Sequence, residues 1–272
     1  MLLWEDRRQM RTAHATFSMS LVGETDVNLL VLPAEAYASD DVISVSVDGA
    51  PLEWQIAPAA HDTRQLLFTA PAGRLDVDVR TSLEGLTRPL DDGDPARYLE
   101  DSRYVEASAL RGFVDERFGR VAGFDAIAAM RQWIARGFTY SPALSGIDDT
   151  AVTSLEKSGG MCRDYAHVMI GLARAAGIPA RYVGVYAPGL QPPDFHAVAE
   201  VHLDGEWWVV DATGLAPRQS LIRIATGADA LETAWATTMR SPVVLQSVMV
   251  RASDDALEEG AVDDVAARVR IA

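Results

Sequence analysis

The sequence predicts an α+β protein, with an antiparallel β unit over residues 1–95 and a mixed helical and stranded unit over residues 96–272. Its 272 residues are enough for two domains at the usual size of about 150 residues each. From residue 12 to 82, apolar and polar residues alternate in short runs that end in turn residues, as antiparallel strands do. After residue 98, apolar residues recur at helical spacing before two further alternating runs, which is typical of an α+β unit.

The first unit contains a clear hairpin signal. Residues 42–47 alternate, Asp48 and Gly49 follow, and a second short run begins at Leu52. Asp-Gly between two alternating runs favours a tight hairpin turn, because both residues tolerate the left-handed backbone that this turn needs. Further alternating runs lie at 65–69 and 75–79, so we expect a small antiparallel β domain.

A polar crossover over residues 83–101 separates the two units. It is rich in Gly, Pro and Asp and poor in apolar residues, so we expect it to be solvated. Beyond it, the stretch 121–136 places Ile127, Met130 and Ile134 on one face of a helix. Gly137 follows this stretch, and glycine is the usual residue just past a helix end.

The charge of the chain argues against nucleic acid and membrane partners. Its 24 basic and 39 acidic residues give a net charge of −15, which repels polyphosphates and anionic lipids. The longest apolar stretch near the middle, 168–173, is far shorter than the about 18 residues that a membrane span needs. The first four residues are followed at once by charged residues and form no secretory leader. We therefore expect a cytoplasmic protein.

Cys162 is the single cysteine of the chain, which excludes an internal disulfide and a multi-thiolate metal site. It begins a predicted helix that runs to stop signals at Gly177 and Pro179. Two glycines precede this helix, and the positive end of a helix dipole stabilises a thiolate. A cysteine that starts an apolar stripe is also typical of a core position, so the pattern by itself leaves both roles open.

His196 and Asp211 lie on two alternating runs that are joined by a second Asp-Gly pair. A two-residue hairpin turn places residue 203 opposite 206, and the same register places Val198 opposite Asp211. His196 shares the face of Val198, so Asp211 is its diagonal neighbour, within reach of a hydrogen bond. A thiol, a base and a carboxylate that fixes the tautomer of the base are the groups that covalent acyl transfer requires. Without the cysteine, the pair equally fits an ion pair on a sheet surface.

Four sequence blocks resemble the bacterial branch of the transglutaminase-like superfamily. They are Gly-Met-Cys-Arg-Asp-Tyr-Ala at 160–166, Gly-Ile-Pro-Ala-Arg-Tyr at 177–182, His-Ala-Val-Ala-Glu-Val at 196–201 and Trp-Val-Val-Asp-Ala-Thr at 208–213. The resemblance implies a papain-like fold, in which the helix of the cysteine packs on an antiparallel sheet. It also implies that Cys162 is the nucleophile, His196 the base and Asp211 the acid that orients it. The preceding β region resembles the β domain often joined to bacterial members.

These residues predict an acyl-transfer enzyme that cleaves an amide or peptide bond of a protein or peptide substrate by hydrolysis. Two alternatives stay open. One is a protein-glutamine γ-glutamyltransferase, which passes the acyl group to an amine, and the other is a binding module that keeps the fold without turnover. We expect neither a cofactor nor a metal site, because acidic pairs such as 148–149 fit no calcium loop.

Several neighbours of the three residues carry secondary expectations. Asp164 is expected to assist the helix start, and His167 to be structural. The Cys162 amide is the expected first donor to an oxyanion, whereas the sequence does not identify the second. The Pro-rich loop 187–195 is expected to border the cleft. Trp207 and Trp208 point to opposite faces of their strand, so we expect one in the core and the other in the cleft.

Overall fold

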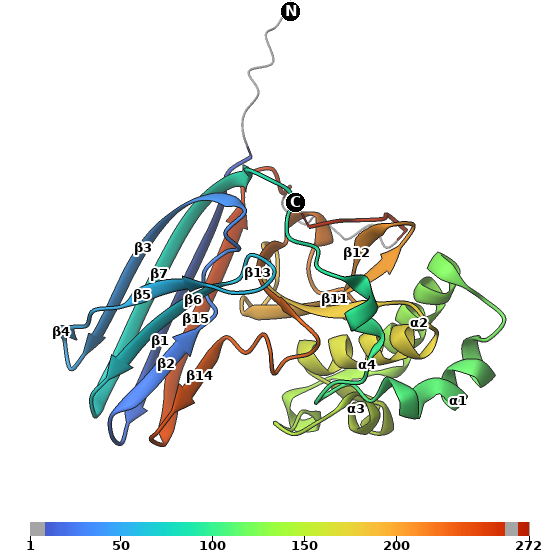
Figure 1. Cartoon of the computed structure of the whole chain (residues 1–272), viewed down its shortest axis with the longest axis horizontal. Coiled ribbons are helices and arrows are strands. Elements are labelled where there is room, and N and C mark those ends of the chain that lie inside the picture. The colour runs from blue at the N-terminus through green and yellow to red at the C-terminus, as the bar shows by residue number, and fades with distance from the viewer. Residues whose placement is uncertain (1–8, 259–265, 272) are drawn as a thin grey trace, which may run out of the picture.

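The computed structural model describes residues 9–258 and 266–271. The chain forms two units that lie side by side: a sandwich of antiparallel sheets, and a unit in which helices cover a four-stranded sheet (Figure 1). This confirms the predicted α+β class with an antiparallel β unit at its start. In the described part of the chain, no helix is long and apolar enough to cross a membrane. The cytoplasmic location stays a prediction.

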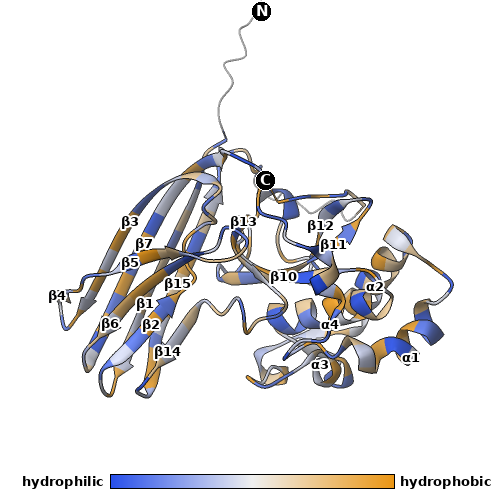
Figure 2. Cartoon of the chain, viewed as in Figure 1, coloured by the Kyte–Doolittle hydropathy of each residue, from blue (hydrophilic) through white to orange (hydrophobic). Residues whose placement is uncertain are grey.

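The larger sheet of the sandwich has five strands in the order β15-β1-β7-β3-β4. Asp48 and Gly49 form the predicted turn, with φ angles of +50° and +82°, and Val47 pairs with Ala50 across it. Hydrophobic and hydrophilic residues alternate along the strands (Figure 2), because successive side chains of a strand point to opposite faces. The strands are β1 (Arg11–Leu21), β3 (Tyr37–Val47), β4 (Ala50–Pro51), β7 (Gly73–Leu86) and β15 (Val243–Asp254).

The smaller sheet has the strand order β14-β2-β6-β5 and shares one apolar core with the larger sheet. Phe17, Leu66 and Val77 belong to this core and are almost inaccessible to solvent. Burial of one such side chain stabilises a fold by about 1.5–3 kcal/mol, so this core holds the two sheets together. The strands are β2 (Thr25–Leu29), β5 (Gln55–Pro58), β6 (Arg64–Ala70) and β14 (Ala236–Met239).

β14 and β15 bring the C-terminal part of the chain back to the sandwich. β14 pairs with β2, and β15 pairs along the whole of β1. The sequence patterns place these residues in the second unit, 96–272, whereas strand pairing adds 236–254 to the sheets of the first. A strand that joins an open sheet edge pairs backbone groups that otherwise lack a strand partner. Because the two strands are far apart in the sequence, this pairing leaves no local sequence pattern. The division near residue 95 stays a prediction.

The second unit surrounds a buried helix, α4 (Cys162–Ala175), with a sheet on one side and three helices on the others. The helix begins and ends where the sequence predicts, and Gly177 follows it with a φ of +78°. The sheet has the order β12-β11-β10-β13. The surrounding elements are α1 (Ala107–Phe118), α2 (Gly123–Gly137), α3 (Ala151–Lys157), β10 (Ala180–Tyr186), β11 (Phe195–Leu203), β12 (Glu206–Val210) and β13 (Ile222–Gly227).

The end of α2 differs from the expectation by one residue. Gly137 is the last helical residue, and Phe138 is the C-cap. The ring of Phe138 packs edge-on against Trp133 and Tyr165, with ring centroids 5.7 and 5.5 Å apart. Aromatic packing at the chain reversal therefore sets where this helix ends, and it overrides the preference for a glycine just past the helix.

The crossover between the units is largely solvated, as its composition predicts, and is anchored at a few points. Its short 3-10 helix, η1 (Pro95–Leu99), buries Tyr98, whose hydroxyl lies 2.6 Å from Nε2 of His61. Arg181 of β10 donates to the backbone oxygen of Asp92 at 2.6 Å. Most residues of the crossover are exposed, as its composition predicts, and the buried Tyr98 and the Asp92 backbone hold it to both units.

Candidate active site

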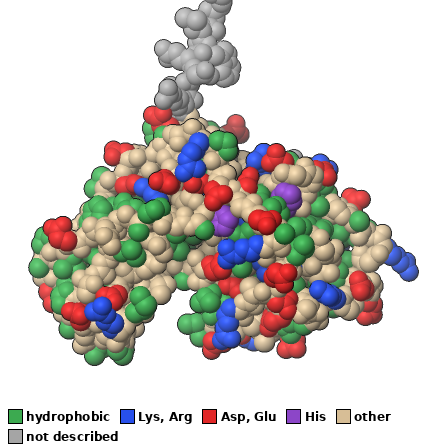
Figure 3. Space-filling model, viewed as in Figure 1, with side chains coloured by type: hydrophobic (Ala, Val, Ile, Leu, Met, Phe, Trp, Pro, Cys, Tyr) green, Lys and Arg blue, Asp and Glu red, His purple; other side chains and the backbone are tan. Residues whose placement is uncertain are grey.

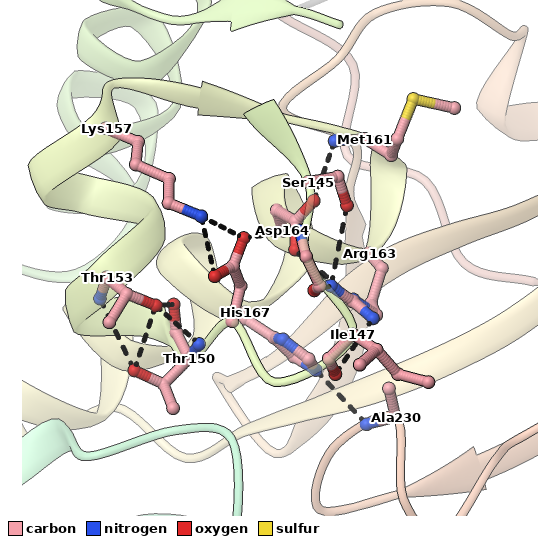
Figure 4. Close-up of polar contacts among 12 residues, drawn as sticks. Ser145, Ile147, Thr150, Thr153, Lys157, Met161, Arg163, Asp164, His167 and Ala230 are labelled. Atoms are coloured by element: carbon pink, nitrogen blue, oxygen red, sulfur yellow. Dashed lines mark hydrogen bonds and ion pairs between the residues drawn. The ribbon is translucent and has the colours of Figure 1, made fainter. Parts of the chain in front are cut away.

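Cys162 is the first residue of α4, and the backbone before it is shaped by glycine. Gly160 has a φ of +148°, a conformation that residues with a side chain rarely adopt. The Asp164 carboxylate accepts a hydrogen bond from the Met161 amide at 2.8 Å (Figure 4), which satisfies one of the free amides at the helix start. Asp164 therefore assists the helix start as predicted. The arrangement presents Cys162 at the positive end of the helix dipole.

Arg163 fastens a neighbouring loop to this helix start. Its guanidinium donates to the backbone oxygens of Gly146 and Ile147 and to the Asp164 carboxylate, the last at 2.9 Å (Figure 4). Asp164 is fully buried, so the pair is shielded from solvent on that side. Because the residue after Cys162 is tied down in this way, the backbone that carries the thiol has little freedom to rotate.

His196 and Asp211 meet across the predicted hairpin. Leu203 pairs with Glu206, and the two turn residues between them have φ angles of +54° and +83°. Nε2 of His196 lies 2.9 Å from Oδ2 of Asp211, and both side chains are buried. Asp211 also accepts hydrogen bonds from the amide and hydroxyl of Thr213, at 2.8 and 2.7 Å. The carboxylate is therefore held on both sides and fixes the orientation of the imidazole.

The electrostatics of this pair favour a charged imidazole. Burial acts to lower the pKa of His196, but the charge and hydrogen bond of Asp211 outweigh it, and with a contribution from Cys162 they raise the pKa to about 10. Burial acts to raise the pKa of Asp211, but the charge of His196 outweighs it and holds the pKa of that carboxyl below its usual range. At neutral pH the pair is therefore an imidazolium and a carboxylate.

The structure brings Cys162 to the same histidine. The charge of the Cys162 side chain acts on His196, so the sulfur lies close to the imidazole. Nε2 is occupied by Asp211, so Nδ1, which is buried, is the ring nitrogen available to the thiol. The three residues predicted from sequence are thus adjacent, in the order Cys162, His196, Asp211. Their catalytic role stays a prediction.

Tyr140 is a fourth member of the site, which the sequence patterns do not reveal. It belongs to β8 (Thr139–Tyr140), which pairs in parallel with β9 (Gly159–Gly160), directly before Cys162. The Tyr140 hydroxyl lies close to Cys162 and interacts with both its backbone and its side chain. Burial and the charge of Cys162 raise the pKa of Tyr140, so the hydroxyl keeps its proton. A two-residue strand has no periodicity from which this placement could be predicted.

Trp207 is buried in the core, as expected for one of the two tryptophans, and Trp208 is partly buried in the packing of the unit. The Trp207 ring lies 3.9 Å from the guanidinium carbon of Arg181, and the Trp208 ring packs edge-on against Phe124. His167 is structural, as predicted. It is buried between aromatic rings and accepts a hydrogen bond from the Ala230 amide (Figure 4), and burial lowers its pKa to about 4.

A cavity of about 430 Å³ lies between the Pro-rich loop and the sandwich. Its lining includes Asp194, two residues before His196, together with Arg251 and Ser253 of β15. The negative charge of Asp194 acts on both His196 and Tyr140, so this cavity adjoins the site. Among the residues that the structure describes, no group of three or more His, Cys, Asp or Glu is arranged to hold a metal ion.

Comparison with known proteins shows which sequences and structures this chain resembles. Residues 115–212 match the core of the transglutaminase-like superfamily. An uncharacterised protein from Mycobacterium leprae is 28% identical over 99 residues, which are 32% of this chain and 34% of the relative. The chain thus spans about a third of the curated relative that it matches. The crystal structure of a proposed cysteine protease from Cytophaga hutchinsonii matches with a TM-score of 0.83 and 25% identity, over 92% of each chain.

Proposed function

Because the core of this chain, residues 115–212, belongs to the transglutaminase-like superfamily, we propose that the protein hydrolyses an amide or peptide bond with Cys162 as the nucleophile. The observation that carries the proposal is the hydrogen bond of the buried His196 to Asp211, with Cys162 close enough to act on the same imidazole through its charge. The similarity along both units to a proposed cysteine protease supports it.

In the first step, the Cys162 thiolate attacks the carbonyl carbon of the substrate. A carbon–sulfur bond forms, and the carbonyl electron pair moves to the oxygen, which becomes an oxyanion. The helix start and the His196 imidazolium stabilise the thiolate before the attack. Since the pKa of His196 is about 10, the imidazolium is present at neutral pH and needs no separate protonation.

Two donors are in place for the oxyanion. The Cys162 amide is one, and the Tyr140 hydroxyl, which lies close to that residue, is the second. When the substrate oxygen lies between the amide and the hydroxyl, both groups donate a hydrogen bond to it. Oriented donors of this kind stabilise the transition state more than the ground state.

In the second step, the carbon–nitrogen bond breaks as Nδ1 of His196 gives its proton to the leaving amine. The product is a thioester on Cys162 and a neutral imidazole. Water then gives a proton to Nδ1 and attacks the thioester carbon, the carbon–sulfur bond breaks, and the acid leaves as the thiolate is restored. Asp211 keeps Nδ1 directed at these atoms throughout.

The reactivity of Cys162 tests the proposal directly, because it is the single cysteine of the chain and all thiol alkylation reports on it. We expect iodoacetamide at pH 6 to alkylate the folded protein much faster than the same protein in denaturant, which is the matched control. His196→Ala should abolish the difference. A folded protein that reacts no faster than the denatured one would favour a binding module instead.

Turnover is the second half of this test. The intact protein should cut denatured casein into peptides detectable by mass spectrometry, and Cys162→Ala should not. If Cys162 reacts rapidly but neither casein nor a panel of peptide amides is cleaved, the hydrolase assignment is wrong.

A further inference from the structure

β15 is a long sheet edge with exposed apolar residues. It ends the strand order of the five-stranded sheet, and in the described part of the chain β1 is its one strand partner. No charged residue lies between Val243 and Val250, although the chain carries a net charge of −15. An edge of this kind is a template for a further strand. The apolar side chains most exposed on it are Val244 (55%), Leu245 (47%), Val248 (41%) and Met249 (40%).

The other edges of the sandwich are short or charged: β4 covers only Ser46 and Val47 of β3, and the open part of β3 carries Asp40 and Asp41. β4 has two residues and ends in proline, β5 has four and also ends in proline, and β14 has four. By contrast, β15 has twelve residues. Its pairing with β1 is irregular at Gln246 and regular from Ser247 to Asp254. Since proteins ordinarily shorten or charge an open edge to avoid association, this exposed strand calls for an occupant.

Aromatic contacts connect β1, the strand beside β15, with the residue before His196. Val248 pairs with Phe17 of β1, and the ring of Phe17 packs edge-on against Trp235 at 5.2 Å. Trp235 in turn stacks on Phe195 at 5.3 Å, and Phe195 directly precedes His196. In Figure 1, β14 and β15 are the strands of the sandwich nearest the second unit, and Figure 3 shows the surface hollowed between the two units.

The cavity described above connects β15 itself with the site at another point. Arg251 and Ser253 of β15 line it on one side, and Asp194 lines it on the side of the loop that leads to His196. The strand therefore approaches the site along an apolar face at its middle and along a polar cavity near its end. A chain lying on β15 would reach both.

We infer that β15 binds a segment of the polypeptide substrate in extended conformation, as an added strand, and so directs the neighbouring bond to Cys162. This inference rests on the proposed hydrolase function. The eight uncharged residues of β15 span about 26 Å at the strand rise, which corresponds to about eight residues of substrate. A second copy of this chain is a weaker occupant, because its charge of −15 repels an identical copy.

Substrate length and lysine substitutions on β15 test this inference together. From the casein digest, two peptides with the same cleaved bond are made, one of about four residues and one of about sixteen, which covers the strand. The double variant Leu245→Lys, Val248→Lys places charges on two of the exposed side chains of β15. The matched control is Val42→Lys on β3, where the valine is 63% exposed. We expect the double variant to raise KM for the long peptide about tenfold, with unchanged kcat/KM for the short one.

Equal kinetics of the double variant and Val42→Lys on the long peptide would overturn the inference. An equal loss on both peptides would also overturn it, because a docking strand cannot affect a substrate too short to reach it. If light scattering shows a dimer that the double variant dissociates without any change in KM, β15 is instead an interface between copies.

Binding separates this inference from the proposed function. In Cys162→Ala, which cannot turn over, fluorescein-labelled denatured casein should bind about tenfold more weakly once the two lysines are added. If no peptide is cleaved by the intact protein but this difference is found, the hydrolase assignment fails and docking on β15 stands. Equal binding with and without the lysines would overturn docking itself.

Discussion

Asp211 accepts the hydrogen bond of His196 at Nε2, over 2.9 Å, and this leaves Nδ1 as the ring nitrogen available to Cys162. The carboxylate thereby does two things to the imidazole. It selects which nitrogen faces the nucleophile, and it raises the pKa of the ring against the effect of burial. Each effect has a measurable consequence when the carboxylate is replaced.

Replacing Asp211 with Asn should lower kcat by about three to four orders of magnitude, because the amide does not fix the required tautomer. The substitution should also lower the pH above which kcat declines. In the intact protein we expect this limit near pH 10, where His196 loses its proton, and in the variant well below it. Thr213→Val, which removes a hydrogen bond to the same carboxylate, is the milder control. An unchanged pH profile in Asp211→Asn would remove Asp211 from the site.

The same pair should affect stability as a function of pH. A histidine whose pKa is higher in the folded than in the unfolded protein stabilises the fold fully below the unfolded value, about 6.5. This stabilisation is lost as the pH rises through the folded value of about 10. The free energy of unfolding should therefore fall between these pH values in the intact protein, and fall less in Asp211→Asn. Urea titrations at several pH values measure both slopes, and parallel slopes would contradict the shift.

Tyr140→Phe should lower kcat by about two to three orders of magnitude if its hydroxyl donates to the oxyanion. KM and the folded structure should change little, because the ring and its contact with Tyr165 are retained. A peptide aldehyde, whose carbon bonds to the sulfur while its oxygen becomes an oxyanion, should also bind less tightly to the variant. Tyr165→Phe removes a nearby hydroxyl and is the control. If the two variants lose activity equally, the loss is not specific to the oxyanion.

Glu200→Gln should be strongly destabilising. Its carboxylate is buried between the guanidinium groups of Arg181 and Arg223, and removing a buried charge that compensates others costs about 3–5 kcal/mol. Glu24→Gln removes an exposed ion pair with Arg240 and should cost less than about 1 kcal/mol. Denaturant unfolding compares the two. Similar small losses of unfolding free energy in both variants would mean that other groups balance the charges of the two buried arginines.

Adding a primary amine at millimolar concentration should divert only a minor share of product from acid to amide. An amine transferase must keep water away from the thioester, which calls for an aromatic wall around it. The tryptophans that could have supplied such a wall, Trp207 and Trp208, are used in packing. Mass spectrometry of the products measures the ratio. A majority of amide product would replace the hydrolase assignment with that of a protein-glutamine γ-glutamyltransferase.

The sequence by itself determined the elements whose signals are local. The Asp-Gly turn sets the register of β11 and β12 within a few residues, and this register is enough to pair His196 with Asp211. The start of α4 is equally predictable, because glycines precede it and an apolar stripe follows. Turn geometry and helical periodicity act over short distances along the chain, so these features could be predicted.

Tertiary structure decided what depends on segments far apart in the chain. Tyr140 reaches Cys162 through a parallel pairing of two-residue strands, and β15 reaches β1 across more than two hundred residues of chain. The buried Glu200 pairs with arginines on two other strands, β10 and β13. None of these contacts produces a periodic pattern, because a hydrogen bond or ion pair between distant segments constrains one residue on each. Strand pairing and side-chain packing in the folded chain therefore decided them.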